Sequence, residues 1–231
     1  MTDVSVILTA HREGVLAGPT VRSAREAMHY AEEELGLAIE VVLVLDRSDE
    51  ITESLLRNGF PEASRIVVAD EGDPGQSRNR GVEVAKGTCV TFLDADDLWS
   101  CNWLVEAWKL VSERPDVIAH SAFNITFGNE RNIWWHVDQE GPFFDEKYLK
   151  WANFWDAMSF ARREVYEQHV FKENDLNLGF GHEDWHWNTL TCAAGLVHKP
   201  AAQTIHFKRR RRGSQMAKVA ASDSVVWPLG L

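Results

Sequence analysis

The sequence contains few cysteines and no long apolar run, and each shortage argues against a class of protein. The three cysteines, Cys89, Cys101 and Cys192, form no CxxC pair and show no metal-ligand spacing. We therefore expect reduced thiols in a cytoplasmic protein rather than a disulfide framework. No apolar stretch approaches the roughly 20 residues of a membrane-spanning helix. The N-terminal stretch MTDVSVILTAHRE lacks the basic and then apolar pattern of a signal peptide. Any membrane contact is expected to be peripheral, at the inner membrane face.

The sequence is also short of basic residues, except in one segment. Its 231 residues include 24 Lys and Arg against 35 Asp and Glu, a net charge of -11, which argues against nucleic-acid binding. Residues 206–218, HFKRRRRGSQMAK, contain no acid. Such a run is either a solvated tail or a basic patch that meets phosphate on a nucleotide, a lipid-linked acceptor or a membrane. The membrane contact would use Lys208–Arg212.

Apolar strands alternate with amphipathic helices through the first half of the chain. Such alternation predicts a parallel sheet covered by helices on both faces, with its functional site where the strands end. The predicted strands are residues 4–10, 39–46, 64–70 and 88–97, and the predicted helices are residues 18–36, 48–59, 73–87 and 100–115.

The pattern weakens after Pro115. Residues 116–127 are strand-like, residues 132–155 are rich in aromatics, and residues 161–169 and 183–195 are typical of helices. We expect one domain spanning residues 1–231. Its first half, residues 1–115, would bind a nucleotide, and residues 116–231 would shape a different pocket and carry the basic segment.

Three carboxylates, Asp94, Asp96 and Asp97, stand at the end of an apolar strand in TFLDADDLWS. If the strand persists, Asp94 and Asp96 project to the same side and form a hard-oxygen site suited to Mg²⁺ or Mn²⁺. A divalent ion would offset their repulsion and the cost of burying them. The alternative is that the acids cap a helix that begins near Trp99, a role that suits Asp97.

The block GQSRNRGVEVAKGTCVTFLDADD closely resembles the nucleotide-sugar half of family 2 glycosyltransferases. In that family a Gly-x-x-x-Arg-Asn-x-Gly helix leads through a turn of small residues to an apolar strand that ends in Asp-x-Asp. The resemblance implies a GT-A type α/β fold with a Rossmann-like, mainly parallel central sheet, and an inverting transferase that depends on Mg²⁺ or Mn²⁺. The matching residues here are Gly75, Arg78, Asn79, Gly81, Ala85, Gly87, Leu93, Asp94 and Asp96.

Two further segments resemble the nucleotide-binding strands of the same family. VSVILTAHRE is similar to its first strand, which implies that Thr9 and Glu13 contact the nucleotide. VVLVLDRSDE is similar to its second strand, which implies that Asp46 holds the base or ribose, and Arg78 is implied to hold the phosphates. Residues 46–49 read DRSD instead of the usual DDGS. The base is therefore left open among UDP-, dTDP- and GDP-sugars.

The segment GFGHEDWHW resembles the Glu-Asp motif of the family, which implies that Asp184 is the catalytic base with Glu183 beside it. Sugar transfer with inversion needs a carboxylate that takes a proton from the acceptor hydroxyl. The alternative is an acidic first helical turn, which stabilises a helix by up to about 1 kcal/mol without catalysis. Trp185 flanks the proposed base and is the best candidate for an aromatic platform under the acceptor sugar.

His206 has two interpretations. A late histidine in many enzymes of this fold completes the metal shell or touches the diphosphate, whereas isolated histidines are often structural. The neighbouring Lys208 and Arg209–Arg212 are suited to neutralising the leaving diphosphate.

Together these features predict an inverting glycosyltransferase that moves a sugar to a hydroxyl of a glycan or a lipid-linked acceptor, in bacterial surface glycan or polysaccharide synthesis. Two alternatives remain: a non-catalytic nucleotide-sugar-binding module and a metal-dependent nucleotidyltransferase. The absence of a GxxxxGK[ST] loop argues against phosphate transfer.

Overall fold

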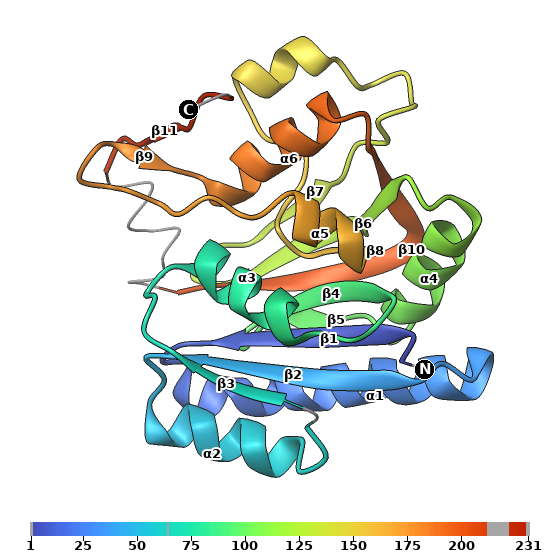
Figure 1. The fold of residues 1–231 in the computed structure, drawn as a ribbon, viewed down its shortest axis with the longest axis vertical. Coiled ribbons are helices and arrows are strands. Elements are labelled where there is room, and N and C mark those ends of the chain that lie inside the picture. The colour runs from blue at the N-terminus through green and yellow to red at the C-terminus, as the bar shows by residue number, and fades with distance from the viewer. Residues whose placement is uncertain (1, 64, 212–221, 230–231) are drawn as a thin grey trace.

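A large mixed sheet runs through the computed structural model, which describes residues 2–63, 65–211 and 222–229 (Figure 1). Within these residues the sheet has nine strands in the order β3-β2-β1-β4-β8-β6-β10-β5, with β7 paired to β6. The strands are β1 (Val4–Ala10), β2 (Ile39–Asp46), β3 (Arg65–Ala69), β4 (Cys89–Asp94), β5 (Leu98–Trp99), β6 (Val117–Gly128), β7 (Asn132–Trp135), β8 (Ser159–Arg162) and β10 (Val197–Arg210).

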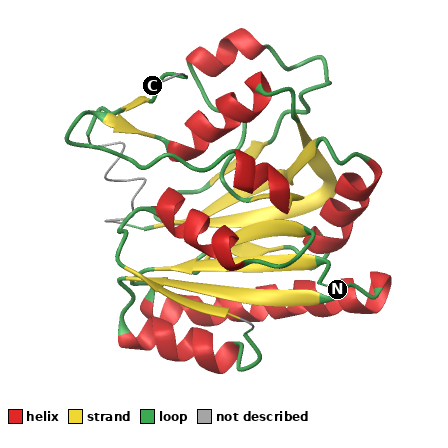
Figure 2. Cartoon of the chain, viewed as in Figure 1, coloured by secondary structure: helices red, strands yellow, loops and turns green. Residues whose placement is uncertain are grey.

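Helices cover both faces of the sheet (Figure 2). One core cluster joins Leu8 of β1 to Ala24 of α1 and Trp103 of α4, and another joins Ile7 of β1 to Val82 of α3. Successive side chains of a strand point to opposite faces, so β1 supplies both clusters. The helices are α1 (Ala17–Leu35), α2 (Glu50–Gly59), α3 (Pro74–Val84), α4 (Trp103–Glu113), α5 (Arg163–Gln168) and α6 (Glu183–Ala193), with the 3-10 turns η1 (Gly14–Leu16) and η2 (Glu146–Lys150).

The first four strands are parallel, as the sequence predicts, and the second half of the chain makes the sheet mixed. β1 lies between β2 and β4 in parallel register. β8 then enters antiparallel between β4 and β6. Strands β6 and β10 are parallel to each other. The α/β fold class is therefore confirmed, with a central sheet that runs through residues from both halves of the chain.

The basic segment is part of this sheet. Residues 206–210 belong to β10, whose His206 and Phe207 pair with the short strand β5. The alternative that residues 206–218 form a solvated tail is therefore wrong for residues 206–211, because strand pairing and buried ion pairs hold them. Residues 212–218 lie outside the described residues.

Helix α4 begins at Trp103, three residues later than predicted. The predicted start, Ser100, instead joins the sheet: its backbone N–H donates to Ile205 O over 2.8 Å and its hydroxyl accepts from Ile205 N over 3.0 Å. Pairing of β5 with β10 thus uses the residues that the sequence favours as a helix start.

Residues 222–229 lie beside the segment that leads into α6. Their strand β11 (Val225–Val226) pairs with β9 (Phe180–Gly181) just ahead of α6. Among the helices that the structure describes, none has the length and apolar character needed to cross a membrane.

Candidate active site

The site forms at the carboxyl ends of β1 and β4. Thr9 and Asp94 are neighbours in the parallel register of these strands. The Thr9 hydroxyl donates to Asp94 Oδ1 over 2.7 Å. The sheet therefore joins two of the predicted donor-binding residues although 85 positions separate them.

Asp46, at the end of β2, lies at the same edge of the sheet, and its carboxylate is hydrogen-bonded to the loop that follows β3. Its carboxylate accepts hydrogen bonds from the backbone N–H groups of Glu71 and Gly72 and from the Ser77 hydroxyl, over 2.8 to 3.0 Å. The side chain is buried. In this arrangement Asp46 shapes the loop that leads into α3.

Arg78, on α3, connects the two halves of the site. Its Nη2 donates to Asp94 Oδ1 over 3.1 Å and its Nη1 donates to Glu183 Oε1 over 3.0 Å. Burial alone would lower its pKa, but the charges of Asp94 and Glu183 raise it above the usual range. The residue is only 3% exposed, so losing either partner would leave a buried charge uncompensated. Arg78 therefore fixes the Asp-x-Asp segment relative to the first turn of α6.

Each of the three clustered aspartates meets a cation of the protein. Asp94 pairs with Arg78, Asp96 accepts from Arg211 Nε over 2.7 Å, and Asp97 lies 3.4 Å from Lys208 Nζ. Strand β4 ends at Asp94, so Asp94 and Asp96 do not share one side of a continued strand. The chain itself thus supplies the positive charge that we expected from a divalent ion.

Asp97 is not a helix cap, which corrects that sequence-based alternative. It is buried five residues before the N-cap of α4, Asn102. Its Oδ1 accepts from the backbone N–H of Arg209 over 2.6 Å. Burial, then the charges of its acidic neighbours, raise its pKa to about 7 in spite of Lys208. The carboxylate therefore anchors β10 beside the site.

Glu13 joins the site through Arg211. It accepts from Arg211 Nη2 over 2.8 Å and from the backbone N–H of His11 over 2.7 Å. Burial raises the pKa of Glu13 to about 7. Arg211 thus holds Glu13 and Asp96 together, two residues that the sequence assigned to the donor side.

Glu183 and Asp184 begin α6 with different surroundings. Glu183 accepts from Arg78 and, over 3.0 Å, from Asn174 Nδ2. Among the described residues, the Asp184 carboxylate accepts one hydrogen bond, from the backbone N–H of Trp185 over 2.7 Å. Burial and the neighbouring Glu183 raise the pKa of Asp184 to about 7. A carboxylate in this state is suited to proton transfer near neutral pH.

His206 and Trp185 occupy less direct positions. The His206 ring packs edge-on against Trp103, with ring centroids 4.4 Å apart, and burial lowers its pKa to about 3. Within the described residues, the ring of His206 packs against Trp99 and Trp103 and makes no hydrogen bond to Asp94 or Asp96. Trp185 is half-buried and donates from Nε1 to Leu149 O over 2.7 Å.

Lys208 belongs to the interior, which corrects the expectation of a membrane contact through it. Its Nζ lies 3.1 Å from Asp156 Oδ2 as well as beside Asp97, and the side chain is buried. Arg211 forms ion pairs with Asp96 and Glu13. Arg212 lies outside the described residues. The sequence drew attention to this basic run, but identifying its partners requires the strand pairing of β10.

Asp96 fits a hard divalent cation. Its Oδ2 accepts from Arg211, whereas in the part of the chain that the structure describes its Oδ1 has no hydrogen-bond partner. Carboxylate oxygens are the ligands that Mg²⁺ and Mn²⁺ favour. An ion here would be held by Asp96, with Asp94 beside it, and would compete with Arg211.

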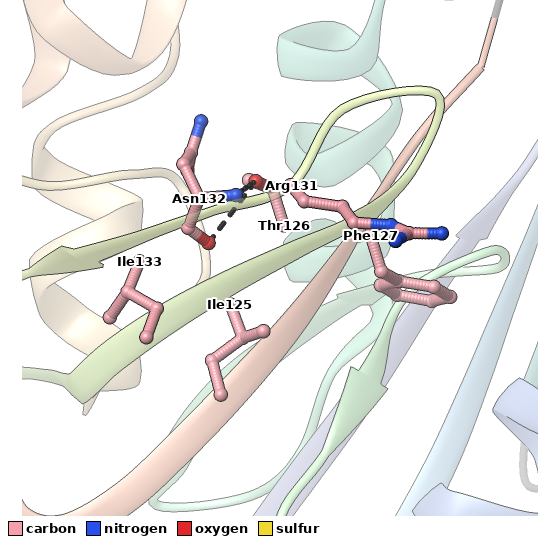
Figure 3. A pocket seen from close by; sticks show the side chains of 6 residues that line it. All are labelled: Ile125, Thr126, Phe127, Arg131, Asn132 and Ile133. Carbon is pink, nitrogen blue, oxygen red and sulfur yellow. Dashed lines mark hydrogen bonds between the residues drawn. The ribbon is translucent and has the colours of Figure 1, made fainter.

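A surface hollow lies on the β6–β7 hairpin (Figure 3). Its rim residue Phe127 carries the Arg209 guanidinium 4.4 Å from its ring centroid, and Arg209 Nε donates to Asp96 O over 3.0 Å. Phe127, at the rim of the hollow, therefore packs against the basic end of β10. It is lined by Ile125, Thr126, Phe127, Arg131, Asn132 and Ile133.

Known proteins resemble this chain in sequence and in fold. Glycosyltransferase GlyG of Streptococcus pneumoniae is 23% identical over 180 residues, which cover 75% of this chain and 52% of GlyG. The crystal structure of S. aureus TarS with UDP-GlcNAc has a TM-score of 0.62 at 17% identity, over 94% of this chain and 61% of that one. The mannosyltransferase PcManGT of Pyrobaculum calidifontis, with GDP-Man and Mn²⁺, has a TM-score of 0.61 at 20% identity, over 91% and 58%.

The chain thus spans about half of GlyG and about three fifths of the two solved chains. The fold is the GT-A type that these glycosyltransferase structures share. The model of the family described as "Glycosyl transferase family 2" matches residues 5–170, well over half of the sequence. The chain belongs to glycosyl transferase family 2.

Proposed function

We propose that this chain is an inverting, metal-dependent glycosyltransferase that moves a sugar from a nucleoside-diphosphate sugar to an acceptor hydroxyl. The observation that carries the proposal is the bridge through Arg78. One guanidinium holds Asp94 of the donor side and Glu183 of the acceptor side. A reaction between two bound substrates gains most from such fixed relative positioning.

Asp184 is the proposed base. Glu183 is tied to Arg78 and Asn174, so it positions the first turn of α6 and leaves Asp184 as the carboxylate that meets the acceptor. Asp184 takes the hydroxyl proton as the oxygen attacks the anomeric carbon, and its raised pKa makes it an effective base near pH 7. The half-buried Trp185 beside it is proposed to contact the acceptor sugar.

Asp96 and Asp94 are proposed to hold Mg²⁺ or Mn²⁺, which supplies charge stabilisation at the donor diphosphate. Mn²⁺ accompanies GDP-Man in the PcManGT structure. Arg211 is the cation nearest to these acids that an incoming diphosphate can recruit, since Arg binds phosphate oxygens bidentately. Thr9, Glu13 and Asp46 remain the proposed nucleoside side. His206 remains proposed as a further ligand, since both of its ring nitrogens are buried without a hydrogen-bond partner among the described residues.

The proposed setting is bacterial surface-glycan synthesis with a glycan or lipid-linked acceptor. The relative GlyG comes from a bacterium, as the family resemblance leads us to expect. The two alternatives, a non-catalytic nucleotide-sugar-binding module and a nucleotidyltransferase, differ from this proposal in their products.

The test measures products released from UDP-GlcNAc and GDP-Man in the presence of Mn²⁺, with wild type, Asp184→Asn and Asp96→Ala. We expect nucleoside diphosphate from wild type and at least about a 100-fold loss in each variant. Circular dichroism verifies that the variants are folded. Nucleoside monophosphate as the product would favour a nucleotidyltransferase. Binding of nucleotide without any turnover would favour the binding module.

A further inference from the structure

A second group of potential metal ligands lies inside the second half of the fold. It consists of His120 on β6, His136 just after β7 and Asp156 ahead of β8, all buried. One nitrogen of each histidine and one carboxylate oxygen of Asp156 lie within 4.8 Å of one another. None of these residues belongs to the site at Asp94, Asp96 and Asp184.

We assign a tautomer to His120 from its hydrogen-bonded neighbours. The single proton of the Thr191 hydroxyl is assigned to Trp187 O, 2.8 Å away, so that the hydroxyl accepts from His198 Nε2 over 2.9 Å. His198 Nε2 therefore carries the proton, and His198 Nδ1 accepts from His120 Nε2 over 2.9 Å. The second nitrogen of His120, Nδ1, is then a bare lone pair. It is fully buried without a hydrogen-bond partner among the described residues.

His136 presents a second nitrogen with a lone pair. Its Nδ1 donates to the backbone carbonyl of Ser121 over 2.6 Å, which leaves on Nε2 a lone pair that accepts a long hydrogen bond of 3.4 Å from Asn124 Nδ2. His136 Nε2 lies 3.7 Å from Asp156 Oδ1. Two ligands at about 2.0–2.1 Å from Zn²⁺ are roughly 3.4 Å apart at the tetrahedral angle, so this pair is close to ligand spacing.

Asp156 is already oriented by its other oxygen. Asn124 Nδ2 donates to Oδ2 over 2.9 Å, and Lys208 Nζ lies 3.1 Å from the same oxygen. Oδ1 is thus the oxygen that faces His136. Outer contacts of this kind orient the ligands in metal sites, where a ligating histidine donates its other N–H to a carbonyl or another acceptor.

We propose that His120, His136 and Asp156 form a buried Zn²⁺ site, distinct from the donor-metal site. Two imidazole nitrogens and a carboxylate oxygen lie within 4.8 Å of one another in the interior, and imidazole nitrogen is a preferred zinc ligand. The ion joins three segments of the second half, β6, the end of β7 and the loop before β8. Through Asp156 it also fixes Lys208, and hence the position of Asp97. The proposal does not depend on glycosyl transfer.

The experiment measures metal directly. Because the ligands are buried, the chain is produced with Zn²⁺ in the medium, dialysed, and its zinc counted by elemental analysis. It is also unfolded, freed of metal and refolded with Co²⁺, whose visible absorption reports tetrahedral nitrogen and oxygen ligands. We expect one equivalent of either ion in wild type and in Asp96→Asn, which removes the donor-metal ligand.

Four variants separate the site from adventitious binding. His136→Gln and His120→Gln should each lose the stoichiometric ion and the Co²⁺ spectrum. His186→Gln, which removes another buried histidine with an unpartnered Nδ1, should retain both. Thr191→Val keeps the shape of the side chain but removes the acceptor for His198, and it should weaken binding about 10- to 100-fold.

The outcomes that overturn the proposal are equally definite. Folded wild-type chain without bound zinc or cobalt would mean that the cluster of His120, His136 and Asp156 holds no ion. Loss of the ion in Asp96→Asn but not in His136→Gln would assign the bound metal to the donor site. If either histidine variant fails to fold, the metal stoichiometry of wild type and the metal affinity of Thr191→Val still test whether His120, His136 and Asp156 bind an ion.

Discussion

Arg211 donates from Nε to Asp96 Oδ2 over 2.7 Å, so the residue proposed to hold the donor metal is already paired with a cation. A divalent ion and this guanidinium compete for the same carboxylate. A diphosphate that engages Arg211 would free Asp96, and the nucleotide and the metal would then assist each other's binding. Such mutual assistance is a coupling free energy and must be reciprocal.

Arg211→Gln should therefore weaken the coupling between Mn²⁺ and nucleotide. In wild type we expect UDP or GDP to tighten Mn²⁺ binding by about 5- to 150-fold. In the variant, Mn²⁺ alone should bind more tightly and nucleotide should add less. Titration calorimetry with and without nucleotide measures both quantities. Arg210→Gln makes the same charge change one residue earlier and should preserve the coupling; equal coupling in wild type and Arg211→Gln would contradict the competition.

The pH profile of transfer should reflect Asp184. The Glu183 and Asp156 carboxylates add to burial in raising its pKa to about 7, while Arg78 opposes them. A base must be ionised, so kcat/KM should fall tenfold per pH unit as pH drops below about 7. Steady-state rates between about pH 5 and pH 9 check this. An acid limb centred near pH 4 would show that Asp184 titrates normally.

Asp184→Asn should stabilise the fold while it abolishes activity. A carboxyl whose pKa is raised in the folded state stabilises that state below its unfolded pKa, and this contribution is lost as pH rises through about 7. Asparagine has no such loss, so we expect a gain of about 1–3 kcal/mol near pH 8 and little near pH 4. Urea unfolding at both pH values measures it, with the exposed Glu113→Gln as a control that should show no gain.

Arg78→Lys should damage both stability and activity, although it retains the charge. A single ammonium does not reproduce the fork that reaches Asp94 and Glu183. We expect a loss of about 2–4 kcal/mol in the free energy of unfolding and a large fall in kcat. Arg80→Lys is the matched control on the same helix, because its ion pairs are exposed and contribute under about 1 kcal/mol. Similar losses in the two variants would remove the special role of Arg78.

The sequence was most informative where local pattern decides the structure. The strands at residues 4–10 and 39–46 match β1 and β2 residue for residue, because continuous β-branched runs favour buried parallel strands. Strand β10 was missed because its polar and basic residues hide its strand character. Lys208 and Arg211 are compensated by Asp97, Asp156, Asp96 and Glu13, and no local pattern reveals ion pairs between residues more than 50 positions apart.

The same limit applied to the site. The acids Asp94, Asp96 and Asp184 could be named from their motifs, and the resemblance implied Asp184 as the base, but the anchoring of Glu183 could not be predicted. It depends on Arg78 and Asn174, which reach Glu183 from other elements. The helix start predicted at Ser100 failed for a related reason, since β10 recruits that residue into the sheet.

The position of β10 late in the chain has a consequence for biosynthesis. The acids at the end of β4 leave the ribosome more than 100 residues before Lys208 and Arg211, so during translation they have no partners from β10. Strand β10 pairs with β6 in the interior of the sheet. The nascent first half must therefore keep these carboxylates hydrated until β10, Val197–Arg210, has been synthesised. The surroundings of Asp96 and Asp97 are therefore complete only when β10 has paired with β6. A chain shortened before residue 197 would lack both this strand and the cations that it carries.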